Sequence, residues 1–225
     1  MMQTQMTSVQ TNRKLVGLLS GTWPPYMVFT SEKYSPFFDT VYVGDFGQCN
    51  LLDYAGLYIP FLSNLDALAE HRQKIAAYLE HGGTVIIEGN GDSRIFPDAV
   101  WTPAPIDQDW WLTDKMNYPS TIENPQHPVF KNLSLPEANW HHHGIYTAIP
   151  DTAEVLQRGR KGEIVTWVDE KKLRGKVFAT TQDCVVEMGV NQITHLDKYL
   201  DALVHWVTGV MPQGKYAPPQ ATLAV

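Results

Sequence analysis

The sequence has few of the residues that mark the most easily recognised functions. Its two cysteines, Cys49 and Cys184, lie far apart and form no CxxC pair, which excludes a disulfide framework and a cysteine metal knuckle. No apolar run approaches the roughly 18 residues that span a bilayer, and the first 12 residues lack the apolar segment of a secretory signal. We therefore expect a cytoplasmic protein that has no membrane partner.

Basic residues are also scarce. There are 17 Lys and Arg against 24 Asp and Glu, which gives a net charge of −7. Because proteins draw most of their affinity for nucleic acids from clustered Lys and Arg, we expect no nucleic-acid partner. The apolar fraction of 44% is sufficient for a sizeable core. A small molecule, a protein partner or a homo-oligomer stays open, and the sequence requires no cofactor.

Short apolar runs that alternate with turns predict one α/β domain. We expect a flexible leader over residues 1–12, this domain over residues 13–210 and a disordered tail over residues 211–225. Four apolar runs are typical of strands buried on both faces of a parallel sheet. They cover residues 14–19, 40–43, 56–60 and 84–88.

A helix before the fourth of these strands is the most clearly marked element. Ser63 or Asn64 can cap its start, and Gly82 with Gly83 can end it. Its apolar face is formed by Leu68, Ile75 and Leu79.

The first strand is followed by Pro24 and Pro25, which predict that no helix begins there at once. We expect an irregular crossover, or a short helix near residues 31–38.

The second half of the chain is less regular. Prolines and tryptophans over residues 94–136 predict an ordered excursion that packs on the domain, either as a loop with aromatic anchors or as a binding surface. Closely spaced turns predict antiparallel strands over residues 144–149, 153–157, 164–168 and 176–181. A last helix begins near Thr194 and ends at Gly209.

The order of these parts resembles the class I glutamine amidotransferase-like superfamily, and most of all its ThuA-like proteins. The resemblance covers most of residues 14–210 and implies a flavodoxin-like α/β fold, with a mostly parallel sheet, helices on both faces and an antiparallel extension. The matching pieces are the strand at 56–60, the helix and strand over 78–88, and the segments 124–133, 164–167, 175–181 and 205–209.

The resemblance also implies catalytic residues that this chain lacks. A glutaminase of this superfamily has a Cys in the sharp turn after the strand that matches residues 84–88, and a His and a Glu after the late strand. Here Asn90 lies in that turn, and Thr181 is followed by Gln182, Asp183 and Cys184. We therefore expect no conventional Cys-His-Glu glutaminase, and whether the chain is an enzyme stays open.

Loops at the carboxyl ends of parallel strands meet at one edge of a sheet, and here they carry polar residues. The alternative is that these residues only form turns. The candidate catalytic residues are Glu88, Asn90 and Asp92, and the candidate ligand-binding residues are Ser20, Thr22, Trp23 and Asp45.

A second group of candidates lies later in the chain. Asp183 and Cys184 follow the late strand, where Cys184 is either a relocated nucleophile or a small buried hydrophobe. His141 and His143 would share one face of a strand and are candidate metal ligands. The third ligand would come from Asp183, Glu187, Cys184 or His127.

Two functions follow from these candidates. The first is a catalytically degenerate amidotransferase-like domain that binds a ligand or serves as a subunit or scaffold. The second is a ThuA-like enzyme that acts on a sugar or small polyol. Its acid–base groups or metal ligands would be Glu88, Asp92, Asp183 and one of His141 and His143.

Overall fold

The computed structural model describes residues 13–218 except 105, 107–109 and 114–116, so the expected leader and residues 219–225 lie outside it. Five parallel strands form one half of the sheet in the order β2-β1-β3-β4-β10, with β2 at its edge. This strand order is that of a flavodoxin-like fold, which confirms the predicted fold class. The strands are β1 (Leu15–Leu19), β2 (Phe38–Tyr42), β3 (Gly56–Ile59), β4 (Thr84–Glu88) and β10 (Lys176–Thr180).

The remaining strands extend the sheet in antiparallel fashion beyond β10, which confirms the extension predicted over residues 144–168. The prediction was wrong for residues 176–181, because β10 runs antiparallel to β9 but pairs in parallel with β4 and so belongs to the parallel part of the sheet. The excursion over residues 94–136 supplies two of them, together with the short helix α4 (Trp110–Thr113). The strands are β5 (Val100–Pro103), β6 (Ser120–Ile122), β7 (Gly144–Ala148), β8 (Glu154–Gly159) and β9 (Ile164–Asp169).

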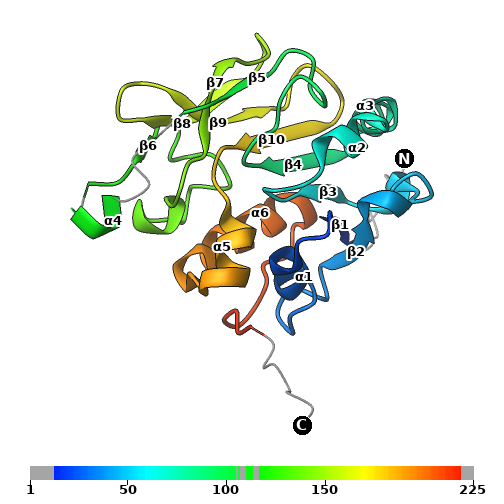
Figure 1. Cartoon of the computed structure of the whole chain (residues 1–225), viewed down its shortest axis with the longest axis horizontal. Helices are drawn as coiled ribbons and strands as arrows, with labels where there is room; N and C mark the ends of the chain where they lie inside the picture. The colour runs from blue at the N-terminus through cyan, green and yellow to red at the C-terminus, as the bar shows by residue number, and fades with distance from the viewer. Residues whose placement is uncertain (1–12, 105, 107–109, 114–116, 219–225) are drawn as a thin grey trace, which may run out of the picture.

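Helices cover both faces of the parallel strands (Figure 1). One face carries α1 (Trp23–Phe29), α5 (Cys184–Asn191) and α6 (Asp197–Thr208). The other carries α2 (Leu65–Ala69) and α3 (Arg72–Glu80). Short 3-10 turns are η1 (Val43–Asp45), η2 (Leu51–Asp53), η3 (Pro136–Ala138) and η4 (Thr194–Leu196).

Strand side chains alternate between the two layers of core because successive residues of a strand point to opposite faces. Tyr58, Ile86 and Phe178 pack with α1, α5 and α6. Their neighbours Leu57, Val85 and Val177 pack with α2 and α3. By this alternation Glu88, two residues after Ile86, points into the layer of α1, α5 and α6.

Three helices differ from the sequence prediction. α1 begins at once after the turn that follows β1, because Pro24 and Pro25 occupy its first turn, where backbone N–H groups have no intrahelical partner. The expected helix before β4 is divided in two, although Asn64 caps its start and Gly82 ends it with a φ of 91°. The sequence analysis missed α5.

The beginning of the expected tail packs on the domain. Tyr216 is 4% exposed, its backbone N–H donates to Asp197 Oδ2 over 3.0 Å, and its ring lies 6.3 Å from that of Tyr34. Within the described residues, no helix combines the length and apolar character needed to cross a membrane.

Candidate functional site

Three chain segments meet where β4 and β10 end. The two strands pair in register, with Glu88 opposite Thr180, so the turns that follow them start side by side. Residues 140–143 lie along the turn after β10: the His143 backbone N–H donates to Thr181 O over 2.9 Å, and the Trp140 N–H donates to Gln182 Oε1 over 2.8 Å. The carboxyl edge of the sheet therefore gathers residues from both halves of the chain.

The three consecutive histidines alternate in direction, although they precede β7 and only His142 forms an isolated β-bridge, to Gln182, instead of the expected strand. His142 is 1% exposed, and its Nδ1 lies 2.8 Å from Thr181 Oγ1. Burial lowers the pKa of His142 to about 3, so this imidazole is neutral and structural. His141 and His143 point to the other side, toward the start of α5.

His143 and Asp183 form a hydrogen-bonded pair. Nε2 of His143 lies 2.7 Å from Asp183 Oδ2, and the ring stacks on Phe61 at a centroid distance of 4.1 Å. Phe61 follows β3 and was missed in the sequence analysis, although its position after a parallel strand was a usable signal. Gly89 makes room for it, because a Cβ there would lie 2.0 Å from the Phe61 ring.

Asp183 is the residue before α5, yet its carboxylate does not cap that helix. The Val185 backbone N–H instead donates to Glu88 Oε2 over 3.3 Å. Asp183 is 2% exposed, and its Oδ1 has no hydrogen-bond partner among the described residues. Burial raises the pKa of Asp183, while the hydrogen bond from His143 acts in the opposite direction.

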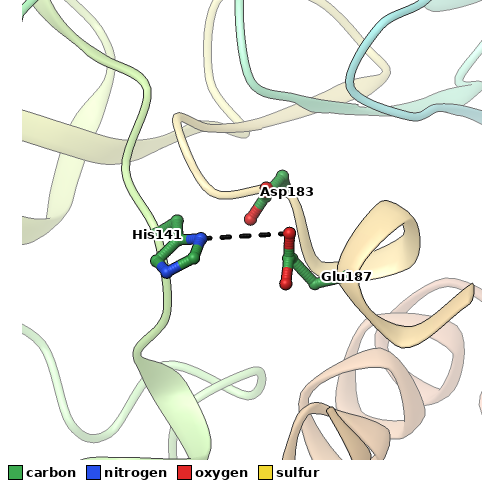
Figure 2. Close-up of side chains that lie close together, drawn as sticks. All are labelled: His141, Asp183 and Glu187. Atoms are coloured by element: carbon green, nitrogen blue, oxygen red, sulfur yellow. Dashed lines mark ion pairs between the residues drawn. The ribbon is translucent and has the colours of Figure 1, made fainter. Parts of the chain in front are cut away.

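His141, Asp183 and Glu187 bring one donor atom each within 4.8 Å of one another, and their side chains face each other from two segments (Figure 2). His141 Nδ1 lies 3.9 Å from Glu187 Oε1. The sequence paired His141 with His143 as metal ligands and named Asp183 and Glu187 among the possible third ligands. In the structure both carboxylates join His141, and His143 instead contacts Asp183.

Glu88 is completely buried beneath this group. Its Oε1 accepts a hydrogen bond of 2.7 Å from Tyr58 Oη, and burial raises its pKa to about 8 in spite of that bond. Glu88 therefore links β3, β4 and α5 as a largely neutral carboxyl group at pH 7.

The remaining residues of the turn after β4 have other surroundings. Arg94 engages Asp92 over 2.9 Å and also pairs with Asp66, so Asp92 belongs to a surface ion-pair network. Asn90 Oδ1 is buried and has no hydrogen-bond partner among the described residues.

The candidate ligand-binding residues lie in two separate places. Ser20, Thr22 and Trp23 lie at the start of α1, which packs on α5, and Ser20 Oγ is buried without a hydrogen-bond partner in the described part of the chain. Trp23 is 59% exposed. Asp45 is exposed and lines a separate surface hollow with Cys49 and Asp53.

Cys184 is fully buried, with its Sγ 3.7 Å from Met188 Sδ. Burial raises the pKa of this thiol well above its usual range. The structure therefore corrects its assignment as a candidate nucleophile, and Cys184 packs as a small hydrophobe.

Comparison with known proteins gives a likeness of structure. No protein-family model matches the chain, and no curated protein sequence matches it. A cytoplasmic protein of Salmonella typhimurium superposes with a TM-score of 0.57 at 13% identity, covering 89% of this chain and 100% of that protein.

Two other solved structures carry more informative descriptions. A ThuA-like protein of Bacteroides uniformis gives a TM-score of 0.55 at 15% identity, over 90% of this chain and 93% of its own. A glutamine amidotransferase of Thermotoga maritima gives a TM-score of 0.54 at 11% identity, over 88% of this chain and 94% of its own. At such identities the likeness concerns the fold alone, and the chain has the α/β fold of the ThuA-like and glutamine amidotransferase-like proteins.

Proposed function

We propose that this chain acts on a sugar or another small polyol by acid–base chemistry at His143 and Asp183, and that it does not hydrolyse glutamine. The observation that carries the proposal is the 2.7 Å hydrogen bond between these two side chains at the carboxyl edge of the sheet. A histidine whose ring a carboxylate orients is a common general acid–base unit.

The surroundings of the pair support a polyhydroxylated ligand. The Glu187 carboxylate, whose side chain is 12% exposed, can accept hydrogen bonds from hydroxyl groups. Phe61 fixes the imidazole of His143 from one side and gives the edge an apolar surface for the carbon skeleton of a ring. The proposal rests on these residues and not on the fold, because one fold supports many functions.

The test is turnover of a panel of sugars and polyols by the full chain, followed by NMR. We expect His143→Gln and Asp183→Asn to lower kcat/KM about 10²- to 10⁴-fold, the usual contribution of a general acid–base group. The matched control is His205→Gln, a change of an exposed histidine on α6, which should leave turnover unchanged. Equal turnover in all variants would contradict the proposal, as would ammonia release from glutamine.

A second candidate is a non-catalytic domain that binds a ligand or serves as a scaffold. It is favoured by the turn at Asn90, which holds no nucleophile, and by the buried thiol of Cys184. Binding of a polyol with no turnover, together with no labelling of Cys184 or Cys49 by glutamine-analogue electrophiles, would establish this candidate over the first.

A further inference from the structure

Two carboxylates and one imidazole face each other at the start of α5, and no Lys or Arg in the described part of the chain pairs with them. Asp183 and Glu187 lie four residues apart, a spacing at which like charges on a helix repel each other. Neither forms an ion pair with a Lys or Arg of the described residues. Glu187 instead lies near His141 and accepts a hydrogen bond of 3.0 Å from Asn191 Nδ2.

The same group has an oxygen atom that the protein leaves without a partner. Asp183 Oδ1 is buried and has no hydrogen-bond partner among the described residues. An Asp that precedes a helix normally accepts a hydrogen bond from the N–H groups of its first turn, whereas Asp183 does not. Because buried polar atoms are nearly always satisfied, this oxygen indicates a missing ligand, and His141 faces the same space with Nδ1.

We infer that His141, Asp183 and Glu187 bind one divalent first-row transition cation, for which Zn²⁺ is the probe. The inference deepens the proposed function and rests on it for the role of the metal, although binding can be measured by itself. One imidazole with two carboxylates is a donor set that suits such ions, whereas Ca²⁺ and Mg²⁺ take oxygen ligands. Three protein ligands leave a coordination position open, as catalytic zinc sites do.

The observed distances fit a site that closes on the ion. Donors around a zinc ion, at about 2.1 Å each, lie roughly 3 to 4 Å apart, whereas the three groups lie within 4.8 Å here. Small side-chain rotations are sufficient, and the side chains of His141 and Glu187 are 20% and 12% exposed and can make them.

His143, the proposed acid–base group, also contacts one of the three ligands. Its hydrogen bond to Asp183 Oδ2 orients the carboxylate and leaves Oδ1 for the cation. The open coordination position would take a hydroxyl group of the polyol, next to the acid–base pair.

The experiment uses the untagged full chain, stripped with EDTA and titrated with Zn²⁺ alone by calorimetry, with elemental analysis of the dialysed complex. We expect one zinc ion per chain and a loss of affinity of about 10- to 100-fold or more in His141→Ala, Asp183→Asn and Glu187→Gln. The controls His205→Ala and Glu80→Gln change exposed residues and should bind as the wild type does. An absence of zinc binding, or binding that all three ligand variants retain, would overturn the site.

Two further readouts separate ligation from folding. Co²⁺ should give the visible absorption of a low-coordinate site in the wild type and not in Glu187→Gln. Zinc should raise the Tm of the wild type, because it binds the native state only, and should not raise that of Glu187→Gln. His143→Gln should keep the stoichiometry and the metal-free Tm but weaken zinc binding about tenfold.

Failure of this inference can be told from failure of the proposed function. Zinc binding at these residues without polyol turnover would leave the metal site standing and refute the acid–base proposal. Polyol turnover by protein that is free of metal and binds no zinc would refute the metal site and leave the acid–base proposal standing.

Discussion

At the residue scale, Asp183 contacts His143 and also belongs to the group formed with His141 and Glu187. Asp183 precedes helix α5, and Glu88 supplies part of the hydrogen bonding at the start of that helix, because its Oε2 accepts a hydrogen bond from the Val185 N–H. Asp183 can therefore contact His143 and still present Oδ1 to the group at His141 and Glu187. Burying the Glu88 carboxyl to achieve this has a consequence for stability that depends on pH.

The first prediction concerns Glu88→Gln. The folded-state pKa of Glu88 is raised to about 8 from 4.5, so between these values the unfolded chain has lost the proton and the folded chain keeps it. Stability should fall as pH rises from about 4.5 through about 8, by roughly 3 to 5 kcal/mol at about 1.4 kcal/mol per pKa unit. Glutamine does not titrate, so the variant should lose this dependence.

Urea unfolding of the wild type and of Glu88→Gln at both ends of this pH range measures the effect. The Gln side chain can still accept the hydrogen bond from Tyr58. The substitution weakens the hydrogen bond from the Val185 N–H, but this loss lowers the free energy of unfolding equally at both pH values. The exposed change Glu80→Gln is the control. A stability difference between wild type and Glu88→Gln that is the same at both pH values would contradict the raised pKa.

At the scale of elements, the packing of α1 on α5 holds the site at the sheet edge. Pro24 lies in the first turn of α1 and Gly189 lies in α5, two residues after Glu187. A Cβ on Gly189 would lie 2.4 Å from the Pro24 carbonyl oxygen. Because that contact involves backbone, a side-chain rotation cannot relieve it.

The second prediction is therefore that Gly189→Ala destabilises the protein. Overpacking lowers the free energy of unfolding by about 1–3 kcal/mol, whereas the higher helix propensity of Ala raises it by about 1 kcal/mol. We expect a lower Tm in thermal unfolding followed by circular dichroism. Val190→Ala, on the exposed side of the same helix at 49% exposure, should change the Tm little. A Gly189→Ala protein as stable as the wild type would show that α1 and α5 can move apart.

At the scale of the whole molecule, a buried charge network ties distant parts of the chain together. Lys33 Nζ lies 2.7 Å from Asp197 Oδ1 and 2.8 Å from Asp201 Oδ2, with its side chain 3% exposed. Tyr34 and the Tyr216 N–H bind the same Asp197 carboxylate. The segment before β2, helix α6 and the start of the tail are thus joined at one point.

The third prediction concerns the tail. Tyr216→Ala should lower the free energy of unfolding by about 2 kcal/mol or more, because it removes a buried ring that packs on Tyr34. Chemical denaturation measures this loss. The exposed neighbour Lys215→Ala should leave stability within about 0.5 kcal/mol. If the two variants proved equally stable, the packing of residues 211–218 would contribute nothing to folding.

Local patterns in the sequence were sufficient to predict most of the parallel strands and to name residues that meet in the candidate site. Short apolar runs and glycine stops marked the parallel strands and the helix end at Gly82, because burial and backbone conformation are local properties. The period of two placed His141 and His143 on one side, and Asp183 and Glu187 were named as possible partners. Helix α5 was not predicted, because its β-branched residues and Gly189 have weak helix propensity. Tertiary packing overrides this weak propensity in the folded protein.

Which polar residues meet depends on the packing of the folded chain. The sequence could not show that Arg94 forms an ion pair with Asp92, that Asp45 lies in a separate hollow, or that Cys184 is fully buried at the start of α5. Each outcome depends on how segments far apart in the chain pack, and periodicity carries no information about those distances. The pairing of β4 with β10 brings Glu88 next to the turn that holds Asp183, and the segment at His141 then completes the group.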